Sequence, residues 1–280
     1  MTESYYDLIQ EQKQERSALD NRMRDDSNLL YLEKYILKDS SGKAVPDIIN
    51  ITLNRPAVFG ANVTTALSGA KLQVAVETED ESIETAYIED FIALTMRSAD
   101  RRLWTRGLPL LNVFADTQFC FRGRTARRIL LREEEGKIVP DITSWDGRYV
   151  YYERGVKGFK WFGYETMRTK TDVEAEYGIG VASKAVGELS SVLDVWDDKK
   201  NEIWVNGEKV REPPHSYGYP PVVFQIVNMG YGPMLLDPGW EKREGESIFF
   251  MVRDIVGELN RLASILQTLN MSQLKTALQY

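Results

Sequence analysis

The feature that most constrains this chain is a regular apolar repeat close to its C-terminal end. Apolar residues recur there in steps of four and three, a period of 3.5 residues. The positions are Ile248, Val252, Ile255, Leu259, Leu262, Leu266 and Leu269. Such a repeat is typical of a long helix that packs lengthwise against other helices. We therefore predict a continuous helix from Ser247 to about Asn270, with Ile255, Leu259 and Leu262 buried.

A second apolar line lies beside the first and widens the predicted contact face. It consists of Phe249, Val256 and Ala263, spaced by seven residues. A stripe of this width can meet more than one partner helix. The chain then stops at Tyr280 without a capping residue, a glycine or a returning element. This ending predicts that the sequence is a fragment of a larger subunit.

Composition limits the class of protein without naming a function. Hydrophobic residues make up 43% and charged residues 28% of the 280 residues, as is ordinary for a soluble globular protein. No apolar run reaches the roughly 18 residues that a membrane span needs, and the polar N-terminus does not resemble a signal peptide. We expect no membrane partner. The single cysteine, Cys120, excludes an internal disulfide.

The order of predicted elements is helices, then antiparallel strands, then one long helix, which defines an α+β fold. An N-terminal helical arm is predicted for residues 1–45, with residues 1–25 loosely held. A mainly helical part follows over residues 46–118 and an antiparallel, strand-rich part over residues 119–228. A connecting loop and the long helix occupy residues 229–280.

Within the helical part, two helices are predicted before residue 70. One is capped by the segment Asp26-Ser27-Asn28 and runs through Leu37, and the other runs from Pro46 toward Ser68 with a kink at Pro56. The strongest helical signal covers residues 82–104. Its predicted apolar face consists of Ile88, Ile92, Met96, Ala99 and Leu103.

Strands are predicted from alternation and turn signals. Residues 71–77 alternate and predict one strand. A meander is predicted over residues 192–211, where Asn206-Gly207 supplies the second turn because both residues tolerate positive φ. A buried strand is predicted for residues 220–224, just before the connection to the terminal helix.

The net charge of −7 is unevenly distributed. Residues 77–90 hold seven acidic residues and no basic one, whereas residues 97–132 hold nine arginines against two acidic residues. Arg122, Arg124, Arg127 and Arg128 form the densest basic cluster. Concentrated positive charge is typical of nucleic-acid-binding proteins. The two segments can equally pair within one subunit or across a subunit boundary, so the four arginines are candidates for subunit contact or for proximity to DNA.

No catalytic or metal-binding motif is evident. The only histidine, His215, lies in a loop with no nucleophile motif nearby, and we interpret it as a turn residue. One histidine and one cysteine exclude the usual zinc ligand sets. Asp194, Asp197 and Asp198 are the remaining carboxylate candidates, and their position at a hairpin turn favours turn polarity. We expect no enzymatic activity, no cofactor and no metal.

Several short motifs resemble those of tailed-bacteriophage portal proteins. They are Asn201 to Gly207, the Gly-Tyr-Pro-Pro-Val-Val core within His215 to Phe224, Gly245-Glu246-Ser247 at the start of a helix, and Leu259-Asn260-Arg261-Leu262 within it. In that family a polar hairpin and a Pro-Val-Val strand close the wing, and a long helix leads into the stem. The resemblance covers most of the chain and assigns its N-terminal part to the outer wing.

The resemblance implies a ring of identical subunits, usually a dodecamer, at one vertex of the capsid. Double-stranded DNA would pass through its channel without specific binding during packaging and ejection. The implied partners are the terminase large subunit, the major capsid protein and head-tail connector proteins. The implied location is the virion, and the host cytoplasm during assembly. Portal subunits are usually longer, so the clip, tunnel loop and crown would follow Tyr280.

Two other classes of protein stay open at this point. One is a magnesium-dependent DNA-processing enzyme built on carboxylates, which needs acidic residues that converge in space. The other is a structural head or tail adaptor that binds no DNA. A portal is distinguished from both because it forms a ring of fixed symmetry with a central channel. The net negative charge of this chain, repeated around a ring of subunits, would favour passage of DNA over its retention.

Overall fold

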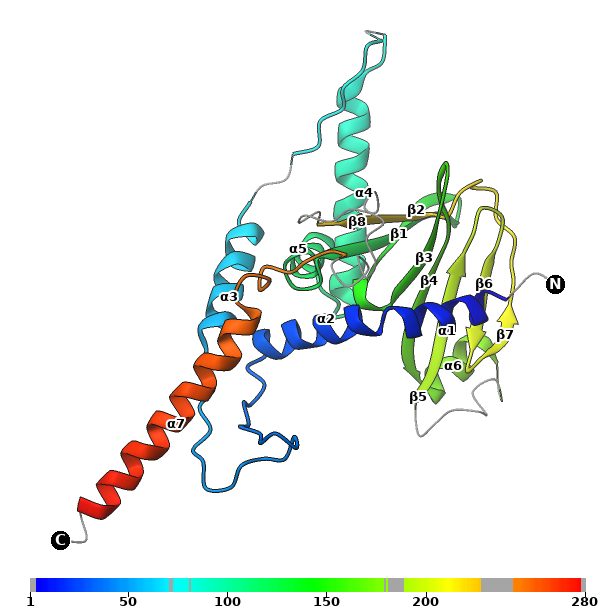
Figure 1. The fold of residues 1–280 in the computed structure, drawn as a ribbon. Coiled ribbons are helices and arrows are strands. Elements are labelled where there is room, and N and C mark those ends of the chain that lie inside the picture. The colour runs from blue at the N-terminus through cyan, green and yellow to red at the C-terminus, as the bar shows by residue number, and fades with distance from the viewer. Residues whose placement is uncertain are drawn as a thin grey trace.

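The computed structural model describes residues 4–70, 73–80, 82–178, 180, 189–227 and 244–277 (Figure 1). It confirms the α+β class, with antiparallel sheets between N-terminal helices and a long C-terminal helix. The helices are α1 (Tyr5–Glu15), α2 (Ser17–Leu30), α3 (Arg55–Ser68), α4 (Thr85–Thr105), α5 (Leu111–Arg122), the 3-10 turn η1 (Gly147–Tyr149), α6 (Lys170–Tyr177) and α7 (Arg253–Ala277). In this described part, no helix is long and apolar enough to cross a membrane.

The strands form two antiparallel sheets, of order β2-β1-β8 and β3-β4-β5-β6-β7. Their bounds are β1 (Arg124–Glu134), β2 (Lys137–Trp145), β3 (Val150–Gly155), β4 (Gly158–Thr169), β5 (Leu189–Trp196), β6 (Asn201–Val205), β7 (Glu208–Arg211) and β8 (Val222–Ile226). The main core lies between the sheets. It contains Ala126, Leu130 and Trp145 from the first sheet and Val150, Phe162 and Trp196 from the second. One hydrophobic cluster thus joins the two sheets into a single body.

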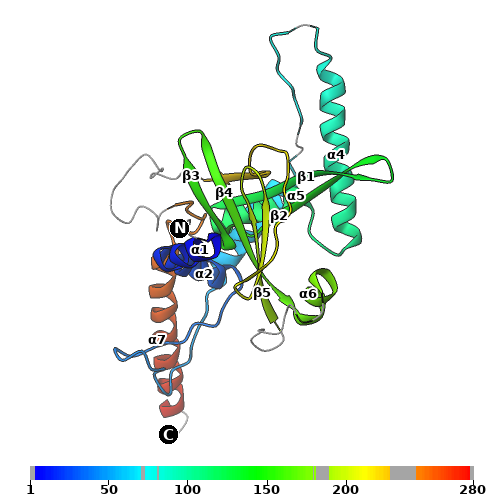
Figure 2. The same ribbon diagram turned by 90° about the vertical axis from the view of Figure 1, so that its right-hand side faces the viewer.

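Helices α1 and α2 are docked on this body (Figure 2). Ile9 on α1 is fully buried against Trp161 and Val195 of the larger sheet. Gly163 makes this contact possible, because a Cβ atom there would lie 2.6 Å from the Ile9 side chain. Met23 on α2 is also fully buried. The prediction of a loosely held N-terminal arm is therefore wrong, since Ile9, Leu19 and Met23 of the arm are all fully buried.

Two predicted helices of the N-terminal half begin or end elsewhere. The helix predicted through Leu37 ends at Leu30, and Asp26 lies inside it instead of capping it. The helix predicted from Pro46 begins at Arg55, with Pro56 in its first turn. The fixed φ of proline favours the first turn of a helix, so Pro56 lies at the start of α3 where a kink was predicted. Residues 31–54, which connect α2 to α3, are mostly irregular.

The predicted hairpins agree with the structure more closely than the predicted N-terminal helices do. The meander β5-β6-β7 is confirmed, and Asn206 and Gly207 turn with φ of 48° and 85°. The strand predicted for residues 220–224 begins at Val222 and continues to Ile226. The strand predicted for residues 71–77 is wrong for residues 73–77, which are not in a strand, and residues 71 and 72 lie outside the described residues.

Helices α4 and α7 leave the body on opposite sides (Figures 1 and 2). The predicted helix at residues 82–104 is confirmed as α4. Its C-terminal half is docked through Ala99 and Leu103, which pack with Leu111 and Ile142. Its N-terminal half extends away from the body, and Ile92 on the predicted face is 37% exposed. The acidic residues Glu77, Glu79 and Asp80 therefore lie at the far end of this projection (Figure 1).

Candidate assembly site: helix α7 and its root

Helix α7 begins later than predicted. Residues 248–252 form hydrogen-bonded turns, and the regular helix runs from Arg253 to Ala277. The start at Ser247 was therefore wrong, whereas the helix continues beyond Asn270. The reason lies in the body, because Ser247 and Phe249 are almost completely buried in it. At 1.5 Å per residue, α7 is about 37 Å long. The predicted connecting loop lies outside the described residues as far as residue 243.

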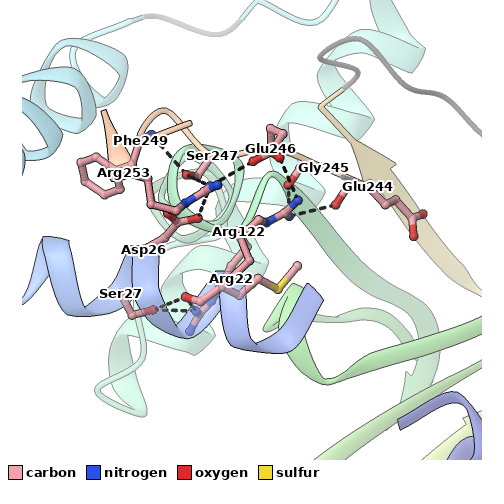
Figure 3. Close-up of polar contacts among 11 residues, drawn as sticks. Arg22, Asp26, Ser27, Arg122, Glu244, Gly245, Glu246, Ser247, Phe249 and Arg253 are labelled. Atoms are coloured by element: carbon pink, nitrogen blue, oxygen red, sulfur yellow. Dashed lines mark hydrogen bonds and ion pairs between the residues drawn. The ribbon is translucent and has the colours of Figure 1, made fainter. Parts of the chain in front are cut away.

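Buried ion pairs hold the start of α7. We call Arg22, Asp26, Glu246, Ser247 and Arg253 the α7 root (Figure 3). Arg253 donates from Nε to Oδ1 of Asp26 at 2.6 Å and from Nη2 to Oδ2 at 2.9 Å. Its Nη2 also lies 3.0 Å from Glu246. Arg22 lies 3.2 Å from the other carboxylate oxygen of Glu246. The root thus connects α2, the segment before α7 and the first residue of α7.

The root carboxylates have little access to water. Asp26 is 1% and Glu246 5% exposed. Burial alone would lower the pKa of Arg253, but its hydrogen bonds to Asp26 and Glu246 outweigh this and raise it. Burial lowers the pKa of Arg22, against the opposing charge of Glu246. Removing one partner of such a network leaves a buried charge without compensation, which is strongly destabilising.

Two segments of the main chain cross closely next to the root. Gly123 ends α5 with a φ of 69°, and Gly245 has a φ of 68°. A Cβ atom on Gly123 would lie 1.8 Å from the carbonyl oxygen of Gly245, so no side chain fits. The amide of Ile248 then donates to the carbonyl of Cys120 at 2.9 Å. The Gly-Glu-Ser motif is therefore the point where the chain crosses the end of α5.

Apolar packing completes this joint. Phe249 is fully buried, and its ring stacks on Phe121 with 5.5 Å between the ring centroids. Ile248 and Leu30 pack against the same cluster. Cys120 also belongs to it, and burial raises the pKa of its thiol. Of the predicted packing residues, Ile248 therefore belongs to the joint.

Beyond the root, the apolar stripe of α7 faces away from the rest of the chain. The exposed fractions are 36% for Val252, 57% for Ile255, 46% for Leu259, 55% for Leu262, 60% for Leu266 and 54% for Leu269. The predicted burial of Ile255, Leu259 and Leu262 is wrong within the single chain. Packing of this stripe against another chain stays a prediction.

The opposite side of α7 is covered, and its buried side chains are polar except for Val256. Asn260 is 5% exposed and Ser264 is fully buried. Both accept hydrogen bonds from the main chain of residues 51–53. Beyond its root, the helix therefore exposes the apolar stripe and covers a face that carries Val256, Asn260 and Ser264. The four-residue spacing of these polar residues was visible in the sequence, but the segment that covers them lies some 210 residues earlier in the chain.

The four arginines of the basic cluster point into the protein. Arg122 donates to the carbonyl of Met23 and to the Ser27 hydroxyl, at 2.9 and 2.6 Å. Arg127 donates to the carbonyl of Leu111 at 3.0 Å. Their placement explains the cluster as internal structure, because these contacts all lie within one chain.

Arg128 and Arg124 are held on the other face of β1, between the sheets. Arg128 bridges Asp194 and Asp141, at 3.0 and 3.3 Å. Arg124 is fully buried, and among the described residues its guanidinium nitrogens have no hydrogen-bond partner. Burial and the neighbouring charge of Arg16 lower the pKa of Arg124 to about 10. Neither side chain offers a free cation to DNA.

The acidic and basic segments do not pair with each other within the described part of the chain. Arg102 pairs with Glu134 and Arg132 with Asp141, both outside the acidic segment. Asp80 instead accepts hydrogen bonds from Ser82, and one residue of the segment, Glu81, lies outside the described residues. Pairing across a subunit boundary stays a prediction.

The remaining candidates for catalysis or metal binding are one histidine and three aspartates, and the structure explains most of them by turns and an ion pair. His215 accepts a hydrogen bond from the amide of Tyr217 at 3.4 Å. The Asp197 carboxylate accepts hydrogen bonds from the main-chain amides of Lys199 and Lys200, both at 2.7 Å, and so stabilises the hairpin turn. Asp194 pairs with Arg128, and Asp198 is exposed. In the part of the chain that the structure describes, no group of three or more His, Cys, Asp or Glu could hold a metal ion.

Comparison with known proteins adds no family to this picture. No protein-family model matches the chain, and no curated protein matches it either.

Proposed function

We propose that this chain is a subunit of a phage portal, a ring at the capsid vertex through which double-stranded DNA is packaged and ejected. The observation that carries the proposal is the outward apolar stripe of α7, from Val252 to Leu269. Contiguous apolar surface marks sites of protein interaction. A 3.5-residue repeat of this length fits a helical neighbour. A ring of identical subunits supplies one such neighbour to every copy.

The way in which α7 is anchored also supports a ring. A ring closes only if each subunit holds its contact surfaces at a constant angle. The ion pairs of the root and the crossing of Gly123 over Gly245 give α7 one direction relative to the sheets. In this proposal the assembled ring engages the terminase large subunit, the major capsid protein and head-tail connector proteins, and resides in the virion.

The charge of the chain fits a channel that lets DNA slide. Each phosphate that a protein neutralises adds affinity through counterion release. The arginine cluster is directed inward, and the net charge is −7. A structural head or tail adaptor would use the same apolar stripe without a channel. No observation on the described residues specifically favours the DNA-processing enzyme.

Negative-stain electron microscopy of the purified full-length protein tests this proposal. We expect rings of one fixed symmetry with a central channel. The double variant Leu259→Asp/Leu266→Asp should prevent ring formation and leave the thermal unfolding of the subunit unchanged, because both residues face solvent in the single chain. The matched control, Gln267→Asp/Gln273→Asp, adds the same charges at exposed positions outside the stripe and should form rings. Particles without a channel, or rings of the Leu variant, would contradict the proposal.

A further inference from the structure

An extended segment of the chain lies along the polar face of α7. We call residues 49–53 the strap, and Asn260, Ser264 and Thr268 the ladder. The strap amides of Leu53, Ile51 and Ile49 donate in turn to the three ladder side chains. The donor-acceptor distances are 2.9 Å from Leu53 to Asn260, 2.8 Å from Ile51 to Ser264 and 2.9 Å from Ile49 to Thr268. The strap therefore runs antiparallel to α7 and binds it through every second amide.

The spacing of the ladder matches the spacing of an extended chain. Two residues of extended backbone advance by about 6.6 Å. Four residues of α-helix advance by about 6 Å. A helix with polar side chains at every fourth position can therefore meet every second amide of an extended segment over three successive positions. This agreement of periods indicates a built contact between the two segments.

The two ladder hydroxyls, of Ser264 and Thr268, each both donate and accept a hydrogen bond. The Ser264 hydroxyl donates to the carbonyl of Asn260 at 2.7 Å, and the Thr268 hydroxyl donates to the carbonyl of Ser264 at 2.8 Å. Since each hydroxyl proton is used inside the helix, the oxygen lone pairs are left to accept the strap amides.

The other side of the strap is held as well. The side chain of Asn50 accepts the amide of Leu37 at 2.8 Å, and that of Thr52 accepts the amide of Tyr35 at 2.9 Å. Odd-numbered strap residues therefore bind α7 through their amides, whereas even-numbered ones bind residues 35–37 through their side chains. The strap is a middle layer between α7 and the segment that follows α2.

The ladder also determines which face of α7 is open. Successive residues of an α-helix are rotated by about 100°, so Leu262 points roughly 200° away from both Asn260 and Ser264. With the strap on the ladder, the apolar stripe must face away from the body. A rotation of α7 that turned the stripe inward would break all three hydrogen bonds.

We propose that Asn260, Ser264 and Thr268 form a binding site for an extended main chain, occupied by the chain's own residues 49–53, and that this occupancy presents the apolar stripe of α7 to a second copy of the chain. The binding site stands on the contacts within one chain. The role in presenting the stripe rests on the proposed function. Asn260, Ser264 and Thr268 are thus positioning residues for assembly.

Residue-resolved amide exchange, measured by NMR on the 280-residue chain, tests the binding site. We expect slow exchange for the amides of Ile49, Ile51 and Leu53 and fast exchange for those of Asn50 and Thr52. In the variant Asn260→Ala/Ser264→Ala/Thr268→Val, the three protected amides should exchange roughly 10- to 100-fold faster, because opening the strap no longer breaks these hydrogen bonds.

Two controls keep this test specific. The triple variant Gln267→Ala/Asn270→Ala/Gln273→Ala changes exposed polar side chains of the same helix and should leave strap exchange unchanged. Thr268→Val, which removes only the hydroxyl, should accelerate exchange at Ile49, whereas Thr268→Ser should not. Equal exchange rates along residues 49–53 of the wild-type chain, or unchanged rates in the ladder variant, would overturn the binding site.

Sedimentation equilibrium tests the link to assembly. Released from the strap, the ladder variant should self-associate about tenfold more weakly than the wild-type chain, since its stripe is no longer held in one orientation. Wild-type association in a ladder variant whose strap amides exchange fast would overturn the positioning role. By contrast, wild-type association of Leu259→Asp/Leu266→Asp would contradict the proposed function and leave the ladder intact, so the two failures are distinguishable.

Discussion

The root of α7 and the length of helix beyond it show opposite patterns of burial. At the root, the charged residues Asp26 and Glu246 are buried beside the fully buried Phe249. Beyond the root, Leu262 is 55% exposed while Ser264, two residues later, is fully buried. The difference teaches that polarity alone does not decide burial. The supply of partners within the chain decides it, because the described residues cover Ser264 and leave Leu262 exposed.

Simple energetics explain why both patterns are tolerated. Burial of a charge costs several kcal/mol, which ion pairs with good hydrogen-bond geometry offset at the root, and a buried amide is satisfied by its hydrogen bond along the ladder. An exposed apolar side chain forgoes about 1.5–3 kcal/mol relative to full burial. The six stripe positions from Val252 to Leu269 would together contribute several kcal/mol to an interface, before the cost of association is subtracted. The root therefore stabilises the single subunit, whereas burial of the stripe would stabilise an assembly of subunits.

The largest expected effect comes from breaking the root. Asp26→Ala should lower the free energy of unfolding by about 3–5 kcal/mol, because Arg253 then keeps a buried charge without its bidentate partner. Urea unfolding followed by circular dichroism measures this. Asp25→Ala, an exposed neighbour on α2, is the control and should change stability by less than about 0.5 kcal/mol. Equal effects of the two substitutions would show that the buried ion pair does not stabilise the subunit.

The second prediction compares the loss of stability on truncating two apolar residues, one buried next to the root and one exposed on the stripe. Phe249→Ala should cost about 3–5 kcal/mol, since it opens a cavity beside Phe121. Leu259→Ala should change the stability of the monomer by less than about 0.5 kcal/mol, since its side chain is 46% exposed. Both values come from urea unfolding at a concentration at which the chain is monomeric. A loss of more than about 2 kcal/mol for Leu259→Ala would mean that the stripe packs within one chain.

Features that depend on neighbouring residues can be predicted from the sequence, whereas those that depend on distant residues, such as the start of α7, cannot. The α+β order, α4 and the Asn206-Gly207 hairpin follow from local patterns, because periodicity and turn chemistry act between neighbouring residues. The repeat of α7 correctly predicts a long helix. It does not predict the start at Arg253, because that start depends on burial of Ser247 and Phe249 against distant residues.

The sites themselves depend on contacts that no local pattern encodes. Asp26 and Arg253 are 227 residues apart, and Leu53 and Asn260 are 207 apart. A single sequence carries no signal that pairs them. The partners of the arginine cluster depend on distant residues for the same reason, because alternation along β1 places Arg127 and Arg128 on opposite faces but does not show that Arg128 pairs with Asp194.

The smallest expected effect concerns DNA, where the prediction is that the arginine cluster contributes almost nothing. Arg128 is committed to Asp194 and Asp141, so Arg128→Ala should destabilise the fold by leaving these carboxylates unpaired. It should leave affinity for duplex DNA unchanged, because a side chain paired inside the protein releases no counterions from phosphates. Arg97→Ala, which removes an exposed arginine of α4, is the matched comparison and should leave stability unchanged.

Fluorescence anisotropy with labelled duplexes of different sequence measures this at physiological salt, with and without magnesium. We expect weak binding with no sequence preference and no cleavage, since a chain of net charge −7 repels the phosphate backbone overall. A channel that lets DNA slide must hold phosphates loosely, so weak binding is what passage requires. Sub-micromolar, sequence-selective binding that Arg128→Ala abolishes would contradict both the internal assignment of the cluster and the sliding channel. Magnesium-dependent nicking would favour the DNA-processing enzyme instead.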